Sequence, residues 1–329
     1  MNVDVAMNIF AKPYQTALSL LSLLQFSERH IDRIYLQFEP QGSMFDPAPP
    51  YVIAEYLAAD RLVIHQPKDW LRRDPVDMGR LDDPEYRWSL RYQYAFEHTD
   101  KRYLLVLHND VLIKRDIVGA MLSVIQDSGH DSGGGAFAVG QIGQCWNCPA
   151  SNEALVRDSG CADFACSPER YRDFRPDFAG LRRLYALAAQ REVFVRPYWE
   201  GWERHYSPDP WPLPECRVNE WGCLVDVQMT RPLVRPEGDI LPFGGYEPCG
   251  NFCLDIDVAW FRELHRRGLH ARHMDILPYL THWVGTGKKT ERKYTQAETN
   301  ARRILEKHFQ PFVAWCRERK NGLFVDSLP

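Results

Sequence analysis

The sequence predicts an α/β fold in which an open, mostly parallel, Rossmann-like sheet has helices on both faces. Short apolar segments alternate with helical segments through residues 1–142, which is the order that successive βα units produce. The segment at 102–107, RYLLVL, is continuously apolar after its first residues, as buried parallel strands are. Such sheets bind ligands at the carboxyl ends of their strands, so functional residues should follow the strands.

Each element is predicted from the spacing of apolar residues and from the prolines and glycines that bound it. Strands are expected at 3–9, 33–38, 61–64, 102–107 and 135–142. One helix should begin near Pro13, because proline suits the first helical turn. Further helices are expected at 51–58, 86–98, 115–126, 182–190, 255–267 and 296–319. Residues 143–250 are rich in cysteine, proline and tryptophan, and should form an irregular insertion.

The composition is that of an ordinary globular protein. Its 329 residues include 40 basic and 44 acidic side chains, a balance that argues against a nucleic-acid partner. No apolar run approaches the roughly 18 residues of a membrane span. The first ten residues, MNVDVAMNIF, do not have the pattern of a signal peptide. We therefore expect a cytoplasmic protein that has no transmembrane segment and binds no nucleic acid.

Four cysteines in two close pairs indicate a metal site. They follow the pattern Cys145-x2-Cys148-x12-Cys161-x4-Cys166, which suits tetrahedral Zn²⁺. Disulfides are rare in a reducing compartment, so the alternatives are buried core thiols or a redox pair. Four sulfur ligands leave no open position on the ion, and we therefore predict a structural Zn²⁺.

His108-Asn109-Asp110 directly follows the most apolar strand. A carboxylate at this place would project into the ligand crevice. There it could join a divalent cation to substrate phosphates. The alternative is a polar turn in which Asp110 caps the next segment.

These residues resemble a known family. The first 140 residues or so resemble the nucleotide-sugar-binding half of GT-A-fold glycosyltransferases, family 2-like, whose Asp-x-Asp motif is similar to LLVLHND. The resemblance implies that Asp110 binds Mn²⁺ or Mg²⁺ on the donor diphosphate. His108 stands where the first aspartate usually is, and its imidazole could contact the metal or the ribose. Asn8, Arg87 and Asn109 are expected to contact the donor.

The C-terminal part resembles the second half of the same enzymes. Asp255 precedes a predicted helix and matches the general base of inverting members, although it could instead be a helix cap. Glu247, in the segment Gly-Gly-Tyr-Glu, is the rival base, because that segment is similar to an acceptor loop of some galactosyltransferases. His282 matches a histidine that is a further metal ligand in some members; the alternative is a buried histidine.

Two further features bear on substrates. Lys288 and Lys289 lie in a glycine-containing loop that could close over a diphosphate and offset its charge, or could be a solvated basic turn. Trp221 is the best candidate for stacking on an acceptor sugar.

The expected organisation has three parts: a nucleotide-sugar-binding half at 1–142, an irregular zinc-bearing and acceptor region at 143–250, and an acceptor and catalytic helix with a C-terminal closing segment at 251–329. The implied reaction is metal-dependent, inverting transfer of a sugar from a nucleotide sugar, expected to be a UDP-sugar. The acceptor would be a glycan, a lipid-linked molecule or a small molecule. The alternatives are a sugar nucleotidyltransferase, whose glycine-rich N-terminal loop the chain lacks, and a non-enzymatic binding module stabilised by zinc.

Overall fold

The computed structural model describes most of the chain in segments. They are residues 2–39, 52–57, 59–69, 71, 74–131, 135–142, 153–160, 177–192, 217–249, 252–253, 256–282, 291–319 and 323–324. Within these segments, no helix combines the length and the apolar character that a bilayer crossing requires.

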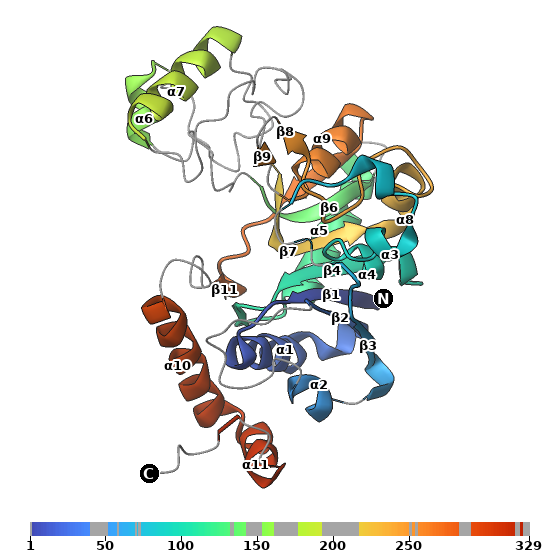
Figure 1. Ribbon diagram of the computed structural model, residues 1–329, viewed down its shortest axis with the longest axis vertical. Coiled ribbons are helices and arrows are strands. Elements are labelled where there is room, and N and C mark those ends of the chain that lie inside the picture. Colours follow the sequence, from blue (N-terminus) through green and yellow to red (C-terminus); the bar gives the residue numbers. More distant parts are fainter. Residues whose placement is uncertain are drawn as a thin grey trace.

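A seven-stranded sheet forms the centre of the molecule (Figure 1), in the order β10-β6-β7-β4-β1-β2-β3. β7 is antiparallel to both of its neighbours, and the other strand pairs are parallel. The mostly parallel sheet that the sequence predicts is therefore confirmed. The strands of this sheet are β1 (Val3–Ile9), β2 (Ile31–Phe38), β3 (Leu62–His65), β4 (Tyr103–His108), β6 (Ala136–Ile142), β7 (Val218–Asp226) and β10 (His270–His273).

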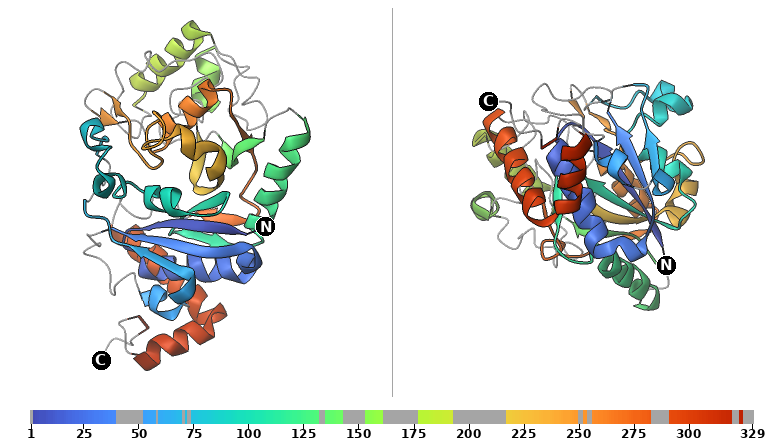
Figure 2. Two further views of the ribbon diagram at one scale, coloured as in Figure 1. Left: turned by 90° about the vertical axis from the view of Figure 1, so that its right-hand side faces the viewer. Right: turned by 90° about the horizontal axis from the view of Figure 1, so that it is seen from below.

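Helices lie on both faces of the sheet, as predicted (Figure 2). Successive residues of β4 show the two layers: Leu104 packs in one apolar core with α4, α7 and α9, while Leu105 packs in the other with α1, α5, α10 and α11. The helices are α1 (Pro13–Ser27), α2 (Val52–Tyr56), α3 (Pro84–Arg87), α4 (Gln93–His98), α5 (Ile117–Asp131), α6 (Glu153–Asp158), α7 (Phe178–Gln190), α8 (Val227–Thr230), α9 (Val258–Arg266), α10 (Glu291–His308) and α11 (Gln310–Arg319). Short 3₁₀ turns are η1 (Glu28–His30), η2 (Ala59–Arg61), η3 (Met78–Arg80) and η6 (Arg231–Leu233).

The single helix predicted at 86–98 is wrong, because the chain turns between α3 and α4. Tyr92 has a φ of 63°, in the left-handed region that ends regular helical hydrogen bonding. The backbone of Gly244 packs against this turn: a Cβ on Gly244 would lie 1.7 Å from the carbonyl oxygen of Arg91. A glycine about 150 residues further along the chain therefore makes room for the turn.

β7 lies within the region 143–250 that the sequence predicts to be irregular. All nine of its residues are buried, yet two of the first four, Asn219 and Glu220, are polar. Asn219 donates to the carbonyl of Gln141 at 3.0 Å, and Glu220 pairs with the buried Arg217. These partners compensate the polar groups inside the sheet. Because of these polar residues, the sequence pattern did not predict a strand here.

Two small antiparallel ladders complete the fold. β5 (Val111–Ile113) pairs with β11 (Leu280–His282), with His282 opposite Val111. β8 (Pro248–Cys249) pairs with β9 (Phe252–Cys253). The β5–β11 ladder returns the C-terminal part of the chain to the carboxyl end of β4.

Candidate metal and donor site

Three side chains meet at the carboxyl end of β4. His108 is the last residue of that strand, Asp110 lies in the turn that leads into β5, and His282 ends β11. The β5–β11 ladder is what brings His282 beside Asp110, from which it is separated by 172 residues of sequence.

The donor atoms of these side chains converge. His282 Nε2 lies 3.2 Å from Asp110 Oδ1 and 3.3 Å from His108 Nδ1, and His108 Nδ1 lies 3.7 Å from Asp110 Oδ1. Ligand atoms that each bind one ion at about 2.1 Å, at angles of about 90–120°, are separated by roughly 3.0–3.6 Å. Lone pairs directed at one another repel unless a proton or a cation lies between them. The three residues therefore fit a divalent cation.

Opposite charges surround this cluster. Lys12 Nζ lies 2.7 Å from the second carboxylate oxygen of Asp110. Glu220 Oε1 lies 3.5 Å from His108 Nε2, and the other oxygen of Glu220 contacts Arg217. The side chains of Asp110 and Glu220 are each only 7% exposed, so these contacts act in a poorly solvated environment.

The charges fix the protonation states. Burial alone would raise the pKa of Asp110, but Lys12 and the two histidines hold it well below its usual range. Burial opposes ionisation of Glu220 as well, yet Arg217 and His108 lower its pKa to about 2. Burial would lower the pKa of His108, but its two carboxylate neighbours raise it above the ordinary value. Both carboxylates are thus ionised, and their negative charges favour a cation at the cluster.

The loop between β1 and α1 presents Lys12 in a strained conformation. Ala11 and Lys12 have φ values of 59° and 63°, and left-handed non-glycine residues cost free energy that other contacts must offset. α10 supplies such contacts. The Lys12 amide donates to the Tyr294 hydroxyl at 2.9 Å, and Glu298 accepts from the amide of Tyr14 at 3.0 Å. α10 lies against α1 (Figure 2), and so it positions Lys12.

The two asparagines predicted to contact the donor lie near the cluster. Asn8 is opposite His108 in the sheet; its Nδ2 donates to Glu39 at 2.8 Å, and its buried Oδ1 has no partner within the described segments. Asn109 Nδ2 donates to Ala11 O at 3.2 Å and to Thr16 Oγ1 at 3.0 Å. The amide of Asn109 thus holds the β1–α1 loop, whereas the Asn8 carboxamide oxygen is buried without a partner in the described segments.

Trp221 lies beneath the cluster. Its ring stacks on the His282 imidazole, with centroids 4.8 Å apart and planes at 15°. Trp221 is only 6% exposed, so it offers little surface to a sugar and instead supports His282 by packing.

Two other predicted site residues have partners outside the cluster. Arg87 is buried and donates to Glu97 at 2.6 and 3.0 Å and to Leu81 O at 2.7 Å. Glu247 accepts from Arg262 at 2.9 Å. Their predicted roles in donor binding and base catalysis stay predictions.

Seven predicted site residues lie outside the described residues. They are the base candidate Asp255, the loop lysines Lys288 and Lys289, and the zinc candidates Cys145, Cys148, Cys161 and Cys166. Their roles also stay predictions.

Sequence reasoning did not assign a role to Lys12 or Glu220. Lys12 stands out in the sequence only as the residue before the helix-starting Pro13. Glu220 could have been found as an acidic residue three positions after Arg217, because a buried acid normally needs a buried base.

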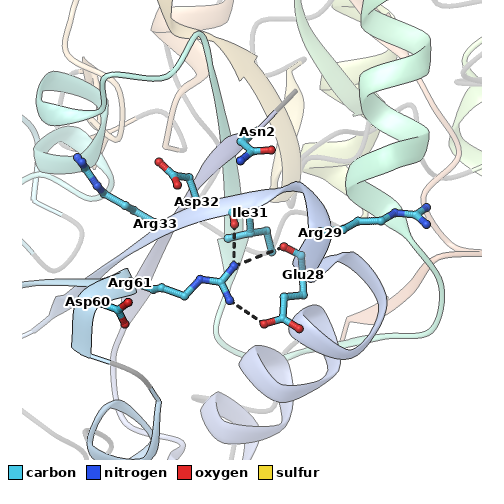
Figure 3. A pocket seen from close by; sticks show the side chains of 8 residues that line it. All are labelled: Asn2, Glu28, Arg29, Ile31, Asp32, Arg33, Asp60 and Arg61. Atoms are coloured by element: carbon cyan, nitrogen blue, oxygen red, sulfur yellow. Dashed lines mark hydrogen bonds and ion pairs between the residues drawn. The ribbon is translucent and has the colours of Figure 1, made fainter.

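A separate polar hollow of about 750 Å³ lies at the opposite ends of the strands from the cluster (Figure 3). It is lined by Asn2, Glu28, Arg29, Ile31, Asp32, Arg33, Asp60 and Arg61. Arg61 donates to Glu28 Oε1 at 2.7 Å and to Ile31 O at 2.8 Å. This hollow is at the amino ends of β1 and β2, away from the edge where open α/β sheets bind ligands.

No protein-family model and no curated protein matches the chain. Several solved structures do. Mouse xyloside xylosyltransferase 1 is 11% identical, with a TM-score of 0.39, over 84% of this chain and 86% of that one. Glucosyl-3-phosphoglycerate synthase from Mycobacterium tuberculosis, solved with Mn²⁺, UDP and phosphoglyceric acid, is 10% identical, with a TM-score of 0.40, over 93% and 78%. An active-site mutant of the galactosyltransferase LgtC is 11% identical, with a TM-score of 0.39, over 91% and 96%.

These matches are to glycosyltransferases, the class of enzyme that the sequence resembles. At such identities and TM-scores they carry no argument about the donor, the acceptor or the mechanism of this chain.

Proposed function

We propose that the protein is a divalent-metal-dependent glycosyltransferase that uses a nucleotide-sugar donor. The observation that carries the proposal is the convergence of His108, Asp110 and His282 at the carboxyl end of β4. Open α/β sheets bind their ligands at this edge, and a nucleoside diphosphate leaves a sugar readily only when its developing charge is neutralised.

His108, Asp110 and His282 would hold the cation. When bound, the ion would act as a Lewis acid on the diphosphate leaving group. Lys12 adds a second positive charge beside Asp110, at 2.7 Å from its carboxylate. Its ammonium group keeps Asp110 ionised and would also contact a donor phosphate oxygen.

Asn8 would orient the nucleoside. Its buried Oδ1 is an unsatisfied acceptor within the described segments, and such an atom costs free energy until a donor group reaches it. The N–H group of a uracil ring or a ribose hydroxyl would satisfy it. We propose a UDP-sugar as the donor on the sequence resemblance, because a contact of Asn8 with ribose would fit any nucleotide.

The acceptor side rests on the sequence. We propose inverting transfer with Asp255 as the general base and Glu247 as its rival, to a glycan, a lipid-linked molecule or a small molecule. A base must lie within about 3 Å of the acceptor hydroxyl that it deprotonates. We also propose that Cys145, Cys148, Cys161 and Cys166 bind one structural Zn²⁺.

A calorimetric titration with UDP tests the function. We expect the wild-type protein to bind UDP in Mn²⁺ and to lose that binding in EDTA. His282→Ala and Asp110→Asn should lose the Mn²⁺-dependent binding, whereas the exposed controls His308→Ala and Asp127→Asn should keep it. UDP binding that is equally strong in EDTA, or intact in Asp110→Asn, would refute the proposed metal-dependent site. Release of pyrophosphate from a nucleoside triphosphate and a sugar phosphate would instead identify a nucleotidyltransferase.

A further inference from the structure

We propose that Glu220 is a positioning residue that orients His108 as a metal ligand. The inference rests on the proposed function in one respect, namely that the cluster binds a divalent cation. It goes further by assigning a role to a buried carboxylate that would not itself touch the ion.

The two ring nitrogens of His108 face different partners. Nδ1 points to the cluster, 3.3 Å from His282 Nε2 and 3.7 Å from Asp110 Oδ1. Nε2 lies 3.5 Å from Glu220 Oε1. An imidazole that binds a metal through one nitrogen carries its proton on the other, and that proton needs an acceptor. Glu220 can accept it and so leave the lone pair of Nδ1 for the cation.

Glu220 is also paired with a buried arginine. Arg217, which is 1% exposed, contacts its second oxygen. Because β7 runs antiparallel between β4 and β6, with Gly222 opposite Leu107, Glu220 lies beside the carboxyl end of β4. The chain Arg217–Glu220–His108 thus runs from the buried sheet to the cluster.

A carboxylate ligand does not need such support. His108 stands where the enzymes that the sequence resembles carry an aspartate, and an aspartate has no tautomer to select. An imidazole at this position has two tautomers, and only one directs a lone pair at the cation. Glu220 would therefore matter only while residue 108 is a histidine, and this dependence separates the proposal from a purely structural Arg217–Glu220 pair.

A double-mutant cycle tests the dependence. The Kd for Mn²⁺, without nucleotide, would be measured by electron paramagnetic resonance of the free ion. Glu220→Gln should raise this Kd by about 10- to 100-fold, as loss of a partner behind a metal ligand usually does. In a His108→Asp background the same substitution should change it less than about 2-fold. Glu97→Gln, which breaks the buried Arg87–Glu97 pair, is the matched control and should leave the Kd unchanged.

Several outcomes would overturn the inference. An unchanged Kd in Glu220→Gln, or an equal loss of affinity in the His108→Asp background, would show that Glu220 does not act through His108. A wild-type protein that binds neither Mn²⁺ nor Zn²⁺ would overturn the proposed function and the inference together, whereas the first two outcomes leave the metal site intact.

A second measurement needs no variant. In the wild-type protein loaded with Zn²⁺, long-range ¹H–¹⁵N correlation spectra report which ring nitrogen of each histidine carries the proton. We expect Nε2 of His108 to be protonated and Nδ1 to be metal-bound. A metal-bound Nε2 would contradict the proposed role, even if Glu220→Gln fails to fold.

Discussion

Glu298 should be one of the largest single contributors to the stability of the N-terminal half. The N-cap residue of α1, Lys12, makes no side-chain cap to this helix. Glu298 of α10 caps the N-terminus of α1 instead. Its carboxylate accepts from the amides of Tyr14 and Gln15 at 3.0 and 3.2 Å and from Gln15 Nε2 at 2.9 Å. A negative charge at a helix N-terminus is favourable.

Replacing Glu298 by alanine would leave three buried donors unpaired. A hydrogen bond to a charged group contributes about 1.5–3 kcal/mol, and unsatisfied buried donors cost further free energy. Because the three share one acceptor group, we expect a total loss of roughly 3–5 kcal/mol in the free energy of unfolding. Glu298→Gln keeps one acceptor oxygen and should lose roughly half as much.

Urea unfolding followed by circular dichroism measures this loss. The control is Glu306→Ala, which removes a half-exposed pair with Arg302 on the same helix and should cost less than about 0.5 kcal/mol. If Glu298→Ala costs no more than Glu306→Ala, α10 does not cap α1, and the account of how Lys12 is positioned fails.

Two further predictions rest on local geometry, and a third rests on the cysteine spacing in the sequence. Gly244→Ala should cost about 3 kcal/mol or more, because its Cβ would overlap the Arg91 carbonyl. Gly268→Ala, where φ is also positive but nothing lies within 4 Å, should cost about 1 kcal/mol; equal losses in thermal unfolding would contradict the argument. Burial raises the pKa of Asp116, but a backbone amide of α5, a serine and an arginine outweigh it and hold this pKa below 3.8. Ionised Asp116 therefore stabilises the fold above about pH 4, and the advantage over Asp116→Asn should vanish as the pH falls through the lowered pKa; a pH-independent difference in unfolding free energy would refute this. Metal analysis should find about one zinc per chain and less in Cys148→Ser, and a metal-free, fully folded wild type would count against the zinc site.

The sequence predicts well the strands that are mostly apolar. β1, β4 and β6 are apolar throughout or nearly so, and their positions were predicted to within two residues. The turn at Tyr92 could not be predicted, because the backbone of Gly244 accommodates it from a distant part of the chain. β7 was missed because Glu220 reads as a surface residue until its pairing with Arg217 is known.

In the candidate site, too, some residues were predictable from the local sequence, and others depend on contacts between distant parts of the chain. Asp110 and His282 were predicted from strand-end position and family resemblance, and the structure brings them within 3.2 Å. The contacts of Lys12 with Asp110 and of Glu220 with His108 depend on how the β1–α1 loop and the reversed β7 pack around β4. No local pattern in the sequence encodes such packing.

The central claim is that His108, Asp110 and His282 bind one divalent cation. It is tested most directly by anomalous diffraction from crystals grown with Mn²⁺ and UDP. We expect an anomalous peak within about 2.0–2.4 Å of His108 Nδ1, Asp110 Oδ1 and His282 Nε2, with the UDP diphosphate beside the ion. Bound UDP with no anomalous peak between these three atoms, and with Lys12 still paired to Asp110, would contradict it.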